Sequence, residues 1–73
     1  MNADDIHNTD NILINGKYET IVLSKKDNII NLSDNTKLIV EHDINTGKDH
    51  FIWCNKDDTI KCKYVSLEKF HNF

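Results

Sequence analysis

The segment from His50 to Leu67 limits what this chain can fold into more than any other, because it gathers the side chains from which a small core is built. It contains the only tryptophan and both cysteines, together with a phenylalanine and a tyrosine. Two runs rich in β-branched and aromatic residues stand on either side of Asn-Lys-Asp-Asp at positions 55–58. A turn-forming cluster between two such runs is typical of a β-hairpin. We therefore expect two paired strands here, against which the other strands pack.

The pairing register decides which side chains of this hairpin share a face, because alternate residues of a strand point to opposite sides. A loop with an even number of residues gathers the large rings on one face, which then carries Phe51, Trp53, Ile60, Cys62 and Tyr64. The opposite face then carries Ile52, Cys54, Thr59, Lys61, Lys63 and Val65. An odd loop would instead bring the two cysteines to one face, with Ile52 and Ile60. We favour the even loop, since each pair of rings adds about 0.5–1.5 kcal/mol beyond area burial.

The favoured register separates the two cysteines. Cys54 and Cys62 then point to opposite faces, and we expect them to be free thiols in a reducing cytoplasm. The first ten residues lack the apolar centre of a secretory signal. No apolar run approaches the roughly 20 residues that cross a bilayer. The pairing scheme, and the inference of a binding module with it, depend on the two cysteines lying apart.

The length of the chain limits the size of its core. A chain of 73 residues makes one domain and buries only about 60% of its unfolded surface. No deep substrate cavity fits inside such a core. Residues 1–10 are polar and acidic and have only Ile6 to bury, so we expect a mobile acidic N-terminal arm. Residues 11–73 are expected to form the single small β domain.

The clearest turn signal is Asn15-Gly16, which lies between two apolar runs and suits the positive-φ positions of a type I′ turn. A two-residue turn there would place Ile14 opposite Lys17. One face of the two strands would then carry Ile12, Ile14, Ile21 and Leu23, and the other Leu13, Tyr18, Thr20 and Val22. Because both faces are apolar, we expect one of them to need a cover.

Turn residues divide the rest of the chain into short strands, which we expect at residues 29–32 and 36–42. The tail changes period, since its apolar residues recur at a spacing of three: Leu67, Phe70 and Phe73. Ser66 suits the cap of a helical turn there. The predicted fold is all-β, a small single-domain barrel or curled antiparallel sheet of about six short strands that ends in a short C-terminal helical turn.

Residue types that bind zinc occur in neighbouring predicted strands, at His42, His50, Cys54 and Cys62. None of them forms the closely spaced Cys or His pairs of ordinary structural zinc sites. A small, apolar, buried cysteine is the commoner situation. We therefore predict no metal site and no cofactor.

Catalysis by a cysteine needs an accessible, electropositive thiol and a positioned base. Lys61 and Lys63 flank Cys62, but neighbours in a strand point away from one another. The paired aspartates at positions 4–5 and 57–58 lie in predicted loops, where carboxylates are solvated and bond the backbone. We therefore predict no catalytic residue and no enzyme activity.

The charge of the chain argues against nucleic acid as the main partner. The net charge is −3 and the nine basic residues are all lysine, whereas arginine is the usual reader of base edges. One alternative stays open, a small β-barrel that binds single-stranded nucleic acid. It would use Lys56, Lys61 and Lys63 as a basic strip and Tyr18 as a stacking platform.

The preferred function is a non-catalytic cytoplasmic binding module, a regulator or inhibitor of a protein. The many Asn, Ile, Lys and Asp residues are typical of AT-rich coding, as in a low-GC bacterium or its phage, and carry no information about mechanism. We expect a phage or mobile-element accessory protein that engages a host protein. The predicted contact face is Ile12, Ile14, Ile21 and Leu23. A partner or a second copy of the chain would cover it.

Overall fold

The structure, a computed structural model, describes residues 1–55 and 58–69. These residues form seven strands and one short 3₁₀ turn. In chain order the elements are η1 (Ala3–Asp5), β1 (Asn11–Ile14), β2 (Tyr18–Lys26), β3 (Ile29–Leu32), β4 (Thr36–Asp43), β5 (Lys48–Asn55), β6 (Asp58–Val65) and β7 (Leu67–Lys69). Four residues used in the sequence predictions, Lys56, Asp57, Phe70 and Phe73, lie outside the described part.

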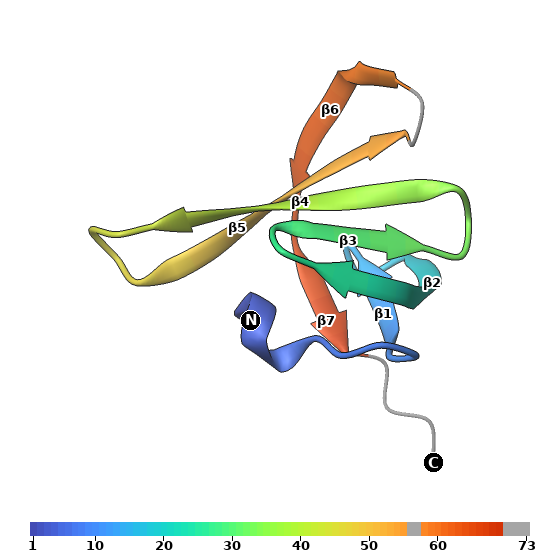
Figure 1. Cartoon of the computed structure of the whole chain (residues 1–73), viewed down its shortest axis with the longest axis horizontal. Coiled ribbons are helices and arrows are strands. Elements are labelled where there is room, and N and C mark those ends of the chain that lie inside the picture. The colour runs from blue at the N-terminus through green and yellow to red at the C-terminus, as the bar shows by residue number, and fades with distance from the viewer. Residues whose placement is uncertain (56–57, 70–73) are drawn as a thin grey trace.

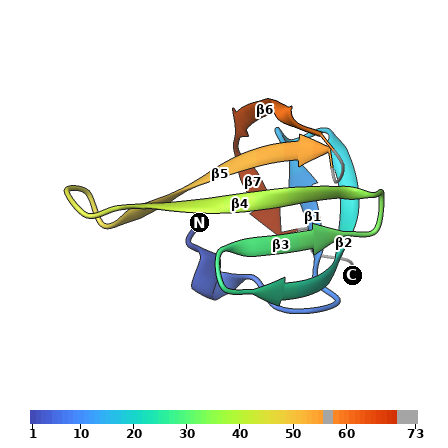
Figure 2. The same ribbon diagram turned by 45° about the horizontal axis from the view of Figure 1, so that its top comes forward.

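The strands form one curled antiparallel sheet in the order β6-β5-β4-β3-β2-β1-β7 (Figures 1 and 2). Only Ser66 separates β6 from β7, so the two ends of this order belong to one stretch of chain. The backbone N–H of Asn15 donates to the carbonyl of Ser66 at 2.8 Å, and the Ser66 N–H donates to Asn15 Oδ1 at 3.0 Å. These bonds tie the β6–β7 junction to the turn between β1 and β2. The prediction of an all-β curled sheet is confirmed.

The core occupies the inner side of the curl. On β4, Leu38 is fully buried and Val40 packs against the core, so Ile39 between them points to the outer side. The same alternation along the other strands supplies the remaining core side chains, which are Ile12, Ile14, Val22, Ile30, Leu32, Phe51 and Leu67.

The N-terminal segment, which we expected to be a mobile arm, lies against the sheet (Figure 1). Ile6 is fully buried and joins the core. The ammonium group of Lys25 donates to the carbonyls of Ala3 and Ile6, and the Ala3 N–H donates to Asp49 Oδ2 at 2.8 Å. The composition of residues 1–10 gave no sign of these partners, because they are supplied by β2 and β5.

The first hairpin differs in register from the prediction by one residue. Ile14 pairs with Tyr18, not with Lys17. Asn15 and Gly16 both have positive φ, 55° and 71°, but the loop also takes in Lys17 as a third residue. A shift of one residue exchanges the faces of a strand. The inner face of this hairpin therefore differs from the predicted one.

The central hairpin forms, but its two ends have different registers. At the turn Asn55 pairs with Asp58, as an even loop requires, whereas farther along Trp53 pairs with Lys63. Between these two pairs β5 has one residue and β6 has four. The odd excess of three residues turns the side chains of β6 to the opposite faces. Tyr64 consequently lies on the outer side, and the prediction that it shares a face with Trp53 is wrong.

The same irregularity brings the two cysteines together. Cys54 and Cys62 form a disulfide with their Cα atoms 4.4 Å apart. A separation near 4.5 Å is typical of directly opposite residues in a non-hydrogen-bonded antiparallel pair. The expectation of two free thiols on opposite faces is wrong. The pairing scheme falls with it, and so do the inference of a binding module drawn from that scheme and the argument for a reducing compartment from free thiols.

The predicted C-terminal helical turn is absent from the part of the tail that the structure describes. Residues 67–69 form β7, where Leu67 pairs with Ile14 and Lys69 with Ile12. Leu67 is buried in the core, and pairing with β1 satisfies the backbone groups that a helical turn would have bonded locally. No helix among the described residues is long and apolar enough to cross a membrane.

Candidate binding surface

The structure does not bring the four predicted contact residues together. Ile12 and Ile14 are 0% and 1% exposed and belong to the core, because the three-residue loop turns them inward. Ile21 and Leu23 stay on the outer side of β2 and are 43% and 58% exposed. The predicted face is therefore wrong as a unit, since half of it lies in the core of the single chain.

A different apolar surface crosses the outer side of the sheet. Ile29 on β3 pairs with Ile39 on β4, Ile39 pairs with Ile52 on β5, and Ile52 pairs with Tyr64 on β6. Directly paired residues on neighbouring strands lie side by side on one face. We call these four residues, Ile29, Ile39, Ile52 and Tyr64, the outer row. Ile29 is 41% exposed and Tyr64 64% exposed, while the two central isoleucines are half-buried.

Charged and polar side chains border the outer row. On β4, Lys37 and Glu41 lie on either side of Ile39 and point the same way. The Tyr64 hydroxyl lies 3.4 Å from both carboxylate oxygens of Glu41 and donates to them. The ring of His50 meets Tyr64 edge-on, with the ring centres 6.3 Å apart. The row is thus an apolar strip with a basic side chain along one border and an acidic one along the other. It ends beyond Ile29 at the exposed Lys26 of β2, which pairs with Ile29.

The disulfide lies beside the outer row and fixes its last member. Lys37 pairs with Cys54 in the next row of the sheet, and Cys54 is bonded to Cys62 on β6. Cys54 is only 1% exposed, although it faces the outer side. Because Cys62 and Tyr64 are two residues apart on β6, the bond holds Tyr64 next to Ile52.

The sequence does not reveal the outer row, because its members come from four separate runs. Nothing within any one run shows that Ile29, Ile39 and Ile52 occupy matching positions. Their alignment depends on the lengths of three turns and on the irregularity in β6. The one signal available was that Ile39 alternates with Lys37 and Glu41, an apolar residue on an otherwise charged face.

The histidines of the β4–β5 hairpin pair with aspartates. His42 Nδ1 lies 2.6 Å from Asp49 Oδ1, and His50 Nε2 lies 3.6 Å from Asp43 Oδ2. The N–H of Ala3, and then His42, lower the pKa of Asp49 below its ordinary value. Across the described residues, no three or more His, Cys, Asp and Glu side chains are grouped so as to hold a metal ion.

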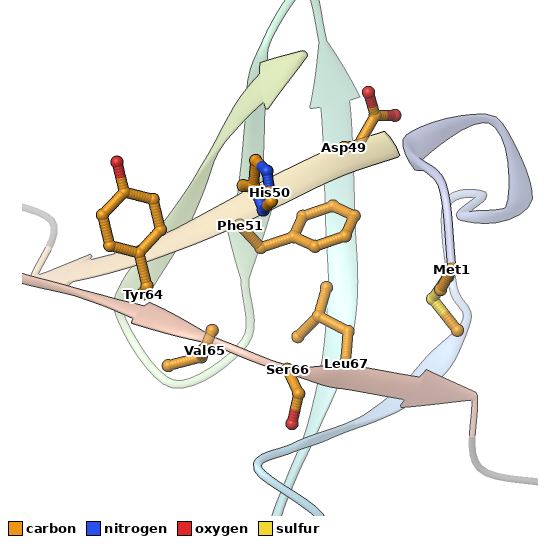
Figure 3. Close-up of a pocket in the computed structure, with 8 residues that line it drawn as sticks. All are labelled: Met1, Asp49, His50, Phe51, Tyr64, Val65, Ser66 and Leu67. Carbon is orange, nitrogen blue, oxygen red and sulfur yellow. The ribbon is translucent and has the colours of Figure 1, made fainter. Parts of the chain in front are cut away.

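A hollow of about 200 Å³ lies between β5 and the β6–β7 stretch (Figure 3). Phe51 and Leu67 point into it, and Met1 lies at its far side. Ordinary ligand sites occupy about 300–1,000 Å³ and are largely enclosed. Hollows of about 420 and 440 Å³ run along the N-terminal segment, lined mainly by polar residues such as Asn2 and Asn8. We therefore take the outer row, not a hollow, as the candidate site.

Two residues of the alternative nucleic-acid site meet at Trp53. The rings of Tyr18 and Trp53 have centres 5.2 Å apart, and Lys63 Nζ lies 5.5 Å from the centre of the Trp53 ring. The indole N–H donates to Thr36 Oγ1 at 2.8 Å. Lys61 is exposed, and Lys56 lies outside the described residues. Tyr18, 42% exposed, is the ring most open to a ligand here.

Comparison with protein-family models, with curated proteins and with solved structures finds no match to this chain. The candidate site therefore rests on geometry and chemistry.

Proposed function

We propose that the protein is a non-catalytic binding module that docks another protein on the outer row. The observation that supports this proposal is the direct register of four apolar side chains on four adjacent strands. Single exposed apolar residues are ordinary, but contiguous ones lower the free energy when a partner removes them from water. Complete burial of an isoleucine contributes about 1.5–3 kcal/mol.

The surface is built on paired central strands and a disulfide, which favours binding. The isoleucines of the outer row project from central strands of the sheet, and a disulfide joins the strand of Tyr64 to its neighbour. A preorganised surface loses little conformational entropy on association. Ile21 and Leu23, exposed on the outer side of β2, extend the apolar area toward the other end of the sheet.

The composition suggests the biological setting of this partner. Enrichment in Asn, Ile, Lys and Asp fits AT-rich coding, and we propose a phage or mobile-element accessory protein that engages a host protein. A regulator or inhibitor of this kind acts through a preorganised binding surface and needs no catalytic group.

Co-purification with two matched variants tests the proposal. Ile39→Lys places a charge at the centre of the outer row, whereas Ile44→Lys makes the same change at the 85%-exposed tip of the β4–β5 hairpin. We expect proteins captured by the wild type and by Ile44→Lys to be lost from Ile39→Lys, with all three chains folded by tryptophan fluorescence. Equal capture by both variants would contradict the proposal.

A second candidate function is supported by the cluster at Trp53. Tyr18, Lys61 and Lys63 offer an exposed ring and two cations, the elements of a site for single-stranded nucleic acid. Binding of this kind weakens steeply with salt. Retention on an oligonucleotide column at low salt, lost in Tyr18→Ala, would support it. Absence of retention at low salt would remove it.

A further inference from the structure

We infer that, when no host protein occupies it, the outer row is covered by a second copy of the same chain, related by a two-fold axis that runs along the row. This inference rests on the proposed function, because it takes the outer row to be a docking surface. The inference names the molecule that occupies the outer row and the symmetry with which it docks.

The charges of Lys37 and Glu41 beside the row favour a second copy of the chain as the occupant. Lys37 and Glu41 lie two residues before and two residues after Ile39, and all three point outward from β4. Each charge therefore lies about 6.6 Å along the strand from the row. A two-fold axis along the row reverses the direction of each strand and leaves positions along the row unchanged. Lys37 then faces Glu41 of the copy, and Glu41 faces Lys37 of the copy.

The apolar residues are self-complementary under the same operation. Ile29, Ile39 and Ile52 each face their own counterpart, as the residues on the axis of an isologous interface do. Face-to-face sheets pack with their strands within about 30° of one another, which this arrangement allows. A two-fold axis parallel to the strands would instead place Lys37 over Cys54 of the copy and leave its charge without a counter-charge. The two Lys37–Glu41 pairs thus favour the axis along the row. The same axis makes the exposed Lys26, which pairs with Ile29 at the end of the row, face its own counterpart, and this like-charge contact weakens the dimer.

The size of the outer row and its charged borders determines the expected affinity of the dimer. The row crosses three strand-to-strand gaps, about 14 Å, and the distance from Lys37 to Glu41 along β4 is about 13 Å. Such a patch is smaller than the roughly 800 Å² that each partner of a stable complex contributes. We therefore expect a weak dimer, with a Kd on the order of 100 µM.

Sedimentation equilibrium of the purified chain tests the inference, from about 10 µM to about 1 mM to bracket that Kd. We expect a monomer–dimer equilibrium that weakens as salt is raised, since the two ion pairs are partly exposed. Lys37→Glu and Glu41→Lys should each weaken it by about fivefold or more, because each opposes like charges twice in the dimer. The double variant K37E/E41K should restore it, since the pairs re-form with exchanged signs.

Lys17→Glu is the matched control, because it makes the same charge change at the exposed β1–β2 turn. It should leave the equilibrium within about twofold of the wild type. A wild type that stays monomeric at about 1 mM, or a double variant no better than the singles, would overturn the inference. If a single variant fails to fold, the salt dependence of the wild type decides.

These outcomes are separate from those of the proposed function. A monomeric wild type whose captured proteins are still lost in Ile39→Lys overturns the second copy as occupant and leaves the docking surface. A dimer that survives Ile39→Lys unchanged overturns the use of the outer row by the second copy.

Discussion

At the scale of single residues, two side chains far apart in sequence attach the N-terminal segment to the sheet. Lys25 is an inward-facing lysine at the end of β2, and it donates to two backbone carbonyls of the segment. Asp49 on β5 accepts the Ala3 N–H and pairs with His42. The sequence showed Ile6 as the one residue of the segment that could be buried, but it did not show these two anchors.

Ile6→Ala should lower the free energy of unfolding by about 2–4 kcal/mol, because it leaves a cavity at a fully buried position. Ile44→Ala makes the same truncation at a position that is 85% exposed and should change stability by less than about 0.5 kcal/mol. Urea unfolding followed by tryptophan fluorescence measures both. Equal effects would mean that the segment is a mobile arm after all.

Asp49 should make the protein sensitive to acid. The Ala3 N–H and His42 lower its pKa below the ordinary value of 3.8 in the folded chain. A group with a lowered folded-state pKa stabilises the fold above its unfolded pKa and loses this contribution as pH falls through the folded pKa. Asp49→Asn should therefore destabilise the protein near neutral pH, and the difference from the wild type should shrink below pH 3.8.

The control for this pH series is Asp27→Asn, at an exposed turn between β2 and β3. Its stability should follow that of the wild type at each pH. A pH-independent difference between Asp49→Asn and the wild type would show that Asp49 acts through its shape and not through its charge.

At the scale of elements, strand positions followed from the sequence and strand registers did not. Turn residues such as Asn15-Gly16 and the cluster at 55–58 marked where each hairpin reverses, and both hairpins formed there. Their registers depend on whether a loop takes two or three residues and on where extra residues enter a strand. Those choices are settled by packing against β3, β4 and β7, which no single hairpin contains. Because each odd shift exchanges two faces, the predicted contact face was wrong although its strands were right.

Loss of the disulfide should destabilise the β5–β6 hairpin. The bond joins residues eight positions apart, and closing so short a loop in the unfolded chain contributes about 2–3 kcal/mol in the chain-entropy description. A reducing agent should lower the free energy of unfolding of the wild type by about this amount. The double variant C54A/C62A should be less stable and insensitive to the reducing agent. Two titratable thiols in the untreated, unfolded wild type would contradict the bond itself.

At the scale of the whole molecule, the curl of the sheet is completed by one stretch of chain that pairs with β5 at its start and with β1 at its end. The sequence predicted a curled sheet from the number of short strands and the spacing of the turns. It did not predict the closing strand, because residues 66–73 have a helical spacing of apolar residues. Pairing of β7 with β1 prevailed over this local preference.

The junction at Ser66 should contribute measurably to the stability of the whole fold. Asn15→Gly keeps the positive φ of 55° at this position but removes the oxygen that accepts the Ser66 N–H. It should cost about 0.5–1.5 kcal/mol of unfolding free energy. Asn15→Asp keeps an acceptor and should cost less. Faster amide exchange of β7 in Asn15→Gly would place the loss at the junction, whereas unchanged exchange would contradict this role.

The position of the Cys54–Cys62 bond limits how far β6 can shift along β5. Continued from the turn without interruption, the alignment would place Tyr64 on the inner side and put Lys61 opposite Ile52, in the last place of the outer row. The disulfide prevents this shift of three residues, because it joins β5 and β6 in the same register as the Trp53–Lys63 pair, beyond the extra residues of β6. The bond is thus compatible with the register in which Tyr64 lies beside Ile52 on the outer side, and not with the uninterrupted one, which would place a lysine there.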